Sequence, residues 1–189
     1  MGEARPSTHQ PPLLVAAVAR RGDEVLVVRQ YGPDGPDTTW ALPGGRCEPG
    51  ELVLEALRRE VMEETGLHVG QVTTLAYCAQ LDNPTPHHRD PYEIPAPGTT
   101  ATVLAFEVTV ADDTLIVADP DGFVNRAEWV PAAKAARLLE QHPFVFTGLP
   151  AASRVVAPPS APPQIWQLRR DASGADRVCS GPDSLTDLH

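Results

Sequence analysis

Residues 44–67, GGRCEPGELVLEALRREVMEETGL, hold the pattern that decides the fold. Pro49 and Gly50 predict a turn, and the residues after them are good helix formers, so we expect a helix from about Glu51 to Thr65. Gly66 follows the last helical residue, where glycine readily adopts the left-handed conformation that ends a helix. The stretch therefore predicts a loop, a helix and a sharp stop.

Six glutamates lie in this stretch, and three of them crowd the end of the helix. At spacings of three and four residues, Glu60, Glu63 and Glu64 project from one neighbouring face. An apolar stripe, which we expect to face a sheet, consists of Leu54, Leu57 and Val61.

Like charges at this spacing repel each other by a few tenths of a kcal/mol per pair on an exposed helix. A divalent cation would remove that repulsion, because Mg²⁺ takes oxygen ligands and combines a few carboxylates with water and substrate phosphates. A solvated acidic face is the more common explanation of clustered glutamates. The helix alone leaves both explanations open.

Strand patterns surround this helix. Two apolar runs at residues 13–20 and 24–30 are joined by Arg21-Gly22-Asp23, which predicts a β-hairpin. Further strands are expected from residue 38 to a stop at Pro43 and at 71–81, 99–110 and 125–130, and a closing helix at 131–141. Strands around one helix and before another predict an α/β sandwich with a mostly mixed sheet.

The composition divides the chain into three parts. Residues 1–11 are polar and are expected to form a flexible tail, and residues 12–145 form the domain. Residues 146–189 are rich in proline, serine and alanine and are expected to be largely disordered. Within them only QIWQLRR, residues 164–170, has an apolar pattern suited to docking.

Charge and cysteine content exclude several classes of protein. The net charge of −10 and pI near 4.9 disfavour binding to nucleic acid polymers and to anionic membranes. No apolar run reaches about eighteen residues, so no membrane span is expected. Three widely spaced cysteines, Cys47, Cys78 and Cys179, are typical of reduced thiols, and we expect a cytoplasmic protein.

The spacing of residues 45–67 resembles the Nudix box at every position of that motif. The matching positions are Gly45, Glu51, Arg59, Glu60, Val61, Glu63, Glu64, Gly66 and Leu67. The flanking TTWALPGG and EWVP segments are also similar to those of family members. The chain is thus identified as a MutT-like member of the Nudix hydrolase family.

The resemblance implies a fold and an activity. The fold would be a Nudix-type α/β/α sandwich with a mixed sheet. The activity would be that of a pyrophosphohydrolase using Mg²⁺ or Mn²⁺ to convert a nucleoside diphosphate linked to a group X into NMP and phospho-X. The candidate substrates are (d)NTPs, nucleotide sugars and ADP-ribose, and a homodimer is possible in this family.

The resemblance also assigns roles to residues. Glu60, Glu63, Glu64 and the backbone carbonyl at Gly45 would hold the metal, and Glu60 or Glu63 would be the general base. Carboxylates of later segments are alternative bases, namely Asp119, Asp121 and Glu128. Glu51 and Arg59 would position the helix and loop.

Substrate recognition is less defined by the sequence. Arg46 and Arg29 are candidates for phosphate contacts, although each can equally be a surface arginine. Tyr92, in a long loop at residues 82–98, could stack on a base. Two other functions remain open: a catalytically silent Nudix domain that senses a nucleotide, and a scaffold whose proline-rich tail recruits a partner.

Overall fold

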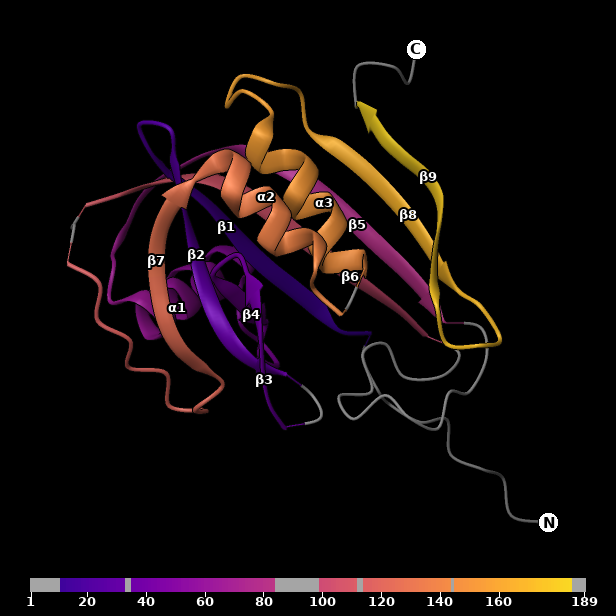
Figure 1. Ribbon diagram of the computed structural model, residues 1–189, viewed down its shortest axis with the longest axis horizontal. Coiled ribbons are helices and arrows are strands. Elements are labelled where there is room, and N and C mark those ends of the chain that lie inside the picture. The colour runs from indigo at the N-terminus through magenta and orange to yellow at the C-terminus, as the bar shows by residue number, and fades with distance from the viewer. Residues whose placement is uncertain (1–10, 33–34, 84–98, 112–113, 144, 185–189) are drawn as a thin grey trace.

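The computed structural model describes residues 11–32, 35–83, 99–111, 114–143 and 145–184. In this part of the chain one nine-stranded mixed sheet lies between helices on its two faces (Figure 1). The strand order is β3-β2-β1-β6-β5-β8-β9, and β4 and β7 pair beside this path with β1 and β2. The pairs β1–β6 and β5–β8 are parallel and the other pairs are antiparallel.

The elements follow the predicted pattern through α2 and continue beyond it. The strands are β1 (Leu13–Arg21), β2 (Glu24–Gly32), β3 (Gly35–Ala41), β4 (Gly44–Arg46), β5 (Val69–Asn83), β6 (Thr99–Val110), β7 (Val124–Pro131), β8 (Gln164–Arg170) and β9 (Asp176–Ser184). The helices are α1 (Val53–Thr65), α2 (Ala132–Glu140) and α3 (Val145–Val156).

The central strand β1 supplies both hydrophobic cores. Because successive side chains of a strand point to opposite faces, Val15, Ala17 and Ala19 pack on the side of α1, whereas Ala16 and Val18 pack on the side of α2 and α3. The two cores make this a three-layer α/β/α arrangement.

Helix α1 begins two residues later than expected and ends as predicted. The Glu55 carboxylate accepts a hydrogen bond from the Leu52 N–H at 3.1 Å, which caps the first turn. Gly66 ends the helix with a φ of 74°. Leu57 and Val61 are buried against the sheet, but Leu54 is 37% exposed, so the expected apolar stripe is narrower than predicted.

The prediction that residues 146–189 are largely disordered is wrong for residues 146–184. Helix α3 packs beside α2, and β8 pairs in parallel with β5 (Figure 1). The QIWQLRR segment is β8, and its alternating residues Trp166 and Leu168 are buried. Composition misled the prediction because four of the six prolines cluster in the short connection at residues 157–163, and the segments on either side of it fold.

A buried ion pair ties this C-terminal region to the sheet. The side chain of Arg154 is fully buried, and its Nε donates to Glu107 Oε1 of β6 at 2.8 Å. The other two guanidinium nitrogens donate to the carbonyls of Ala161 and Pro159 at 3.1 and 3.0 Å. Arg20 of β1 also contacts the Glu107 carboxylate, at 3.2 Å. Arg154 therefore links α3, the proline-rich connection and the central sheet.

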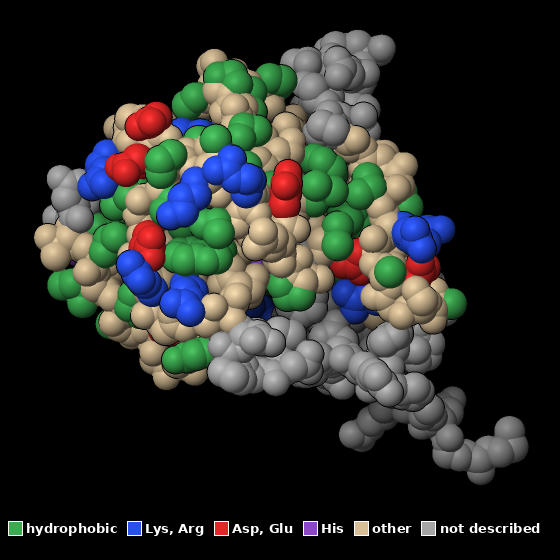
Figure 2. Space-filling model, viewed as in Figure 1, with side chains coloured by type: hydrophobic (Ala, Val, Ile, Leu, Met, Phe, Trp, Pro, Cys, Tyr) green, Lys and Arg blue, Asp and Glu red, His purple; other side chains and the backbone are tan. Residues whose placement is uncertain are grey.

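The outer face of α2 and α3 is mixed in character. Figure 2 shows basic, acidic and hydrophobic side chains interspersed over this face, and Lys134 and Arg137 of α2 are exposed there. Within the described ranges, no helix combines the length and the apolar character needed to cross a membrane.

Candidate active site

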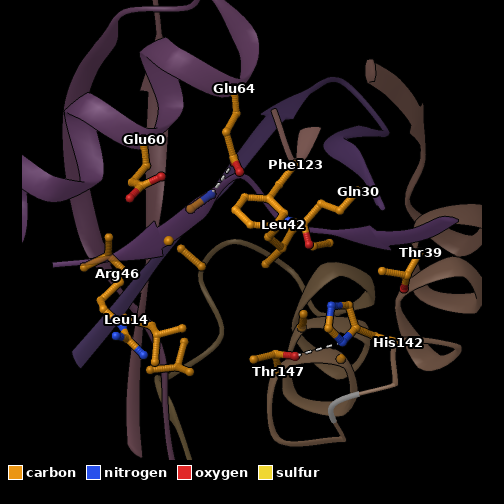
Figure 3. Close-up of a pocket in the computed structure, with 18 of the residues that line it drawn as sticks. Leu14, Gln30, Thr39, Leu42, Arg46, Glu60, Glu64, Phe123, His142 and Thr147 are labelled. Carbon is orange, nitrogen blue, oxygen red and sulfur yellow. Dashed lines mark hydrogen bonds between the residues drawn. The ribbon is translucent and has the colours of Figure 1, made fainter. Parts of the chain in front are cut away.

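A cavity of about 450 Å³ lies beside α1 and reaches the corner between α2 and α3 (Figure 3). Its volume is within the range typical of small-molecule sites. One end is polar and is lined by Gly44, Gly45, Arg46, Glu60 and Glu64. The apolar part of the lining includes Leu14, which pairs with Arg46 across β1 and β4, and Leu42, Val103, Phe146 and Ala151; His142 and Thr147 also line the cavity.

The loop after β3 forms the floor of the polar end. The Pro43 carbonyl accepts a hydrogen bond from Ala17 N–H at 2.8 Å, and Cys47 N–H donates to the Leu13 carbonyl at 2.9 Å, so both ends of the loop are held on β1. Gly44 has a φ of 152°, and a Cβ there would lie 2.1 Å from the Val15 carbonyl oxygen. Glycine is therefore required at this position.

Glu64 is buried at the inner wall of the cavity. Its side chain reaches from α1 to the loop, where Oε2 accepts a hydrogen bond from Gly44 N–H at 2.8 Å, and the residue is only 6% exposed. Burial raises the pKa of Glu64 well above its usual value, and the nearby Glu60 and Asp119 carboxylates add to the rise. A cation beside this buried carboxylate would stabilise its charged form.

Glu60 lies beside Glu64 at the same end. Figure 3 shows both side chains extending from α1 toward the cavity. The Glu60 carboxylate rests against Gly45, where an added Cβ would lie 2.6 Å from its atoms. Burial also raises the pKa of Glu60, while Arg59, whose Nη1 donates to Oε1 at 2.9 Å, opposes the rise. The glycine thus leaves the space that the carboxylate occupies.

Arg59 connects the helix to the loop before it. Its Nε and Nη2 donate to the two carboxylate oxygens of Glu51, both at 2.9 Å, and Nη2 also donates to the Arg46 carbonyl at 3.1 Å. This hydrogen bonding lowers the pKa of Glu51 and raises that of Arg59. Arg59 Nη1 further contacts Glu63 at 3.2 Å. Glu55, which also lies within reach along the helix, caps Leu52 instead.

Glu63 is placed differently from the other two glutamates. It pairs with Arg59 and is absent from the residues that line the cavity, whereas Glu60 and Glu64 line it. In the part of the chain that the structure describes, no three acidic, histidine or cysteine side chains are arranged as a preformed metal cluster. Two inward carboxylates still fit Mg²⁺, which completes its shell with water and substrate phosphates.

The alternative candidates for the general base differ in their position relative to the cavity. Asp119 and Asp121 line the cavity, but Asp119 accepts hydrogen bonds from the N–H groups of Asp121 and Val124 at 3.0 and 2.7 Å, which holds the turn before β7. Glu128 does not line the cavity and pairs with Arg126 on β7. Asp119 therefore contributes charge near Glu64 while its oxygens are engaged by the backbone.

The three predicted substrate contacts have different outcomes. Arg46 lines the cavity. Arg29 lies on β2 and is not among the lining residues, whereas its neighbour Gln30 is. Tyr92 lies outside the described residues.

Sequence reasoning missed several cavity residues. They are Gln30, Tyr31, Thr39, Phe123, His142 and Thr147. Tyr31 and Phe123 are 46% and 48% exposed, which the sequence does not reveal because both residues lie outside the box. His142 and Thr147 give no local signal, because α3 places them at the cavity.

Known proteins resemble this chain in sequence and in fold. Residues 10–148 match the family model of the NUDIX domain. The human 8-oxo-dGDP phosphatase NUDT18 is 42% identical over 64 residues, which cover 34% of this chain and 20% of that protein. The putative 8-oxo-dGTP diphosphatase 2 of Mycobacterium tuberculosis is 40% identical over 60 residues, covering 32% of this chain and 43% of the relative.

A solved structure confirms the architecture. A NUDIX hydrolase from Nitrosomonas europaea is 25% identical, with a TM-score of 0.54, over 77% of this chain and 91% of its own. The matched segments span less than half the length of either curated relative named above. The family model covers most of the sequence, and the predicted α/β sandwich and box are both confirmed. This chain belongs to the NUDIX domain family.

Proposed function

We propose that this chain is a metal-dependent hydrolase that cleaves the pyrophosphate bond of a nucleoside diphosphate derivative, giving NMP and phospho-X. One observation carries the proposal: the carboxylates of Glu60 and Glu64 enter a ligand-sized cavity next to a glycine loop that is held on the central strand. A merely solvated acidic face would not bury Glu64 to 6% exposure.

The proposed metal ligands are Glu60 and Glu64, with the backbone carbonyl at Gly45, and Glu63 is the outermost candidate. A bound Mg²⁺ or Mn²⁺ would neutralise the phosphate oxygens and make the attacking water more acidic. The donor set consists of oxygen atoms alone and therefore suits either ion.

The side chains of this chain have separate tasks in the reaction. Water oxygen forms a bond to phosphorus, the bridging P–O bond breaks, and the departing phosphate takes the bond's electrons. Glu60 is the preferred acceptor of the water proton, because its carboxylate lines the cavity whereas that of Glu63 does not. Glu63, held by Arg59 outside the cavity, is the alternative base.

Arg59 and Glu51 are proposed as positioning residues. Their paired hydrogen bonds at 2.9 Å fix the loop at Glu51 relative to the turn of α1 that carries Arg59 and Glu60. Arg46 is the proposed phosphate contact, since it lines the polar end of the cavity.

The proposed substrates are nucleotides. The curated relatives named above act on 8-oxo-dGDP or 8-oxo-dGTP by their names, which places purine nucleoside di- and triphosphates first in the panel. (d)NTPs, nucleotide sugars and ADP-ribose complete it.

The test is phosphate release from this panel with Mg²⁺, with Mn²⁺ and with EDTA. Glu64→Gln keeps the size of the side chain and removes its charge, and we expect at least a 100-fold loss of kcat because a cation ligand is lost. Glu140→Gln, the same change at an exposed position of α2, is the matched control. Nucleotide binding without turnover would instead support a sensor, and full activity of Glu64→Gln would contradict the metal role.

A further inference from the structure

We propose that Tyr31 and Phe123 form an aromatic platform at the opening of the cavity, on which the base of a nucleotide stacks. The inference rests on the proposed function, because it assigns one part of that substrate to a place in the protein. Tyr31 lies near the end of β2 and Phe123 comes directly before β7, so neither belongs to the box.

The platform borders the same cavity as the carboxylates of the box. Tyr31 and Phe123 line this cavity together with Glu60 and Glu64, yet they remain 46% and 48% exposed. Residues that line a cavity and also face solvent lie at its opening. Figure 3 shows the Phe123 ring with Glu64 and Gln30 to either side of it in that view. One ligand can therefore meet the aromatic residues and the proposed cation site at once.

A short turn fixes the backbone around Phe123. The two oxygens of the Asp119 carboxylate accept hydrogen bonds from Asp121 N–H at 3.0 Å and Val124 N–H at 2.7 Å. The Asp119 carbonyl accepts a further one from Gly122 N–H at 3.2 Å, and Gly122 has a φ of 71°, which glycine adopts without steric cost. The residues on both sides of Phe123 are thus held in place before a ligand binds, and such preorganisation lowers the entropic cost of binding.

The backbone also joins the two aromatic residues, because Tyr31 N–H donates to the Phe123 carbonyl oxygen at 3.0 Å. In a regular strand the side chains of Gln30 and Tyr31 would point to opposite faces, yet both line the cavity. The strand is irregular here: the pairing of β2 with β7 shifts register between Arg29 and Gln30, and its pairing with β3 shifts between Tyr31 and Gly32. Such irregularities redirect side chains and are common next to active sites.

Stacking on a base uses the exposed part of each ring and does not require that either ring lack other contacts. Every base has a π face, so stacking tolerates any base and gains with the size of the ring system. A single exposed apolar side chain is normal on a protein surface. Two aromatic residues joined by a backbone hydrogen bond at one ligand-sized cavity are instead suited to a flat ring. The platform therefore selects ligands that carry a base, with purines held more tightly than pyrimidines.

The experiment measures binding without turnover. Calorimetry with Mg²⁺ compares GMP and CMP, which contain no pyrophosphate bond, with ribose 5-phosphate, which lacks a base. Tyr31→Ala and Phe123→Ala each remove one ring, whereas Tyr31→Phe and Phe123→Tyr retain it. Val156→Ala is the matched control, because Val156 is 59% exposed on α3 and does not line the cavity.

We expect each alanine variant to weaken GMP binding by about 5- to 100-fold, and CMP binding by less, because one stacking surface is lost. Binding of ribose 5-phosphate should be unchanged, and the ring-retaining variants and the control should bind GMP as wild type does. Unchanged GMP affinity in either alanine variant overturns the proposal, as does an equal loss for GMP and ribose 5-phosphate. Thermal unfolding verifies that each variant is folded, and if one alanine variant is unfolded the other still tests the proposal.

Kinetics separates this inference from the proposed activity. Stacking acts alike in the ground state and the transition state, so each alanine variant should raise KM for dGTP and leave kcat nearly unchanged. If wild type cleaves no substrate of the panel but the alanine variants lose affinity for GMP, the activity fails and the platform stands. If wild type cleaves dGTP and the alanine variants keep its KM and the affinity for GMP, the activity stands and the platform fails.

Discussion

Arg154→Ala is expected to destabilise the fold more than any exposed charge substitution in the described chain. The side chain is fully buried and donates to the Glu107 carboxylate at 2.8 Å and to the carbonyls of Pro159 and Ala161 at 3.0 and 3.1 Å. Alanine would remove all of these bonds and leave a void between α3, the proline-rich connection and β6.

The size of the expected loss of stability depends on the buried groups that remain after the arginine is removed. Removing one member of a buried ion pair costs about 3–5 kcal/mol, because the remaining charge is left without compensation. Here Glu107 retains its ion pair with Arg20 at 3.2 Å, which reduces the loss of stability. The carbonyls of Ala161 and Pro159, however, also lose a charged hydrogen-bond donor. We therefore expect a loss of about 3–5 kcal/mol in the free energy of unfolding, and a fall in Tm of about 10 °C.

Urea unfolding followed by circular dichroism measures this loss. Arg169→Ala is the matched control, since Arg169 is 65% exposed and pairs with Asp82 at 3.0 Å on the surface. Such a pair contributes less than about 1 kcal/mol. Arg154→Lys should fall between the two, because lysine keeps the charge but cannot make the three directed bonds.

Equal stability of Arg154→Ala and Arg169→Ala would refute the reasoning. It would mean that the C-terminal region does not depend on the buried pair. Limited proteolysis gives a second readout, since we expect cleavage in residues 157–163 to become faster in Arg154→Ala than in the control.

Two further predictions concern the site and pH. Gly45→Ala places a Cβ 2.6 Å from the Glu60 carboxylate. Because only this flexible side chain must move, we expect an unchanged Tm but about a 100-fold loss of kcat. Undiminished turnover would show that the position of the Glu60 carboxylate does not matter for activity. Burial raises the pKa of Tyr77 above its usual value of 10.0, so above pH 10 the unfolded chain loses a proton that the folded chain keeps. The free energy of unfolding of wild type should therefore fall relative to Tyr77→Phe by about 1.4 kcal/mol per pH unit as the pH rises above 10; parallel curves in urea titrations would contradict this.

Local patterns predicted most of the domain correctly. The hairpin through Arg21-Gly22-Asp23, the box helix and its stop at Gly66 all depend on interactions within a few residues, and each is present in the structure. The segment QIWQLRR, which was expected only to dock, is strand β8. Short-range rules of turns, caps and periodicity suffice for such elements.

The C-terminal region could not be predicted in the same way. Its composition is typical of disorder, yet Arg154 pairs with Glu107, which is 47 residues away in sequence. Such a contact leaves no local trace, because the free energy that orders the segment comes from a distant strand.

For the site, the sequence by itself determined the spacing of the candidate residues Glu60, Glu63 and Glu64 on one helix and the glycines that precede it. Only the tertiary structure decided that Glu60 and Glu64 enter the cavity while Glu63 pairs with Arg59 outside it. It also decided that His142 and Thr147 line this cavity. The physical reason is that helical periodicity sets which side chains share a face, whereas packing against the loop and α3 sets what that face meets.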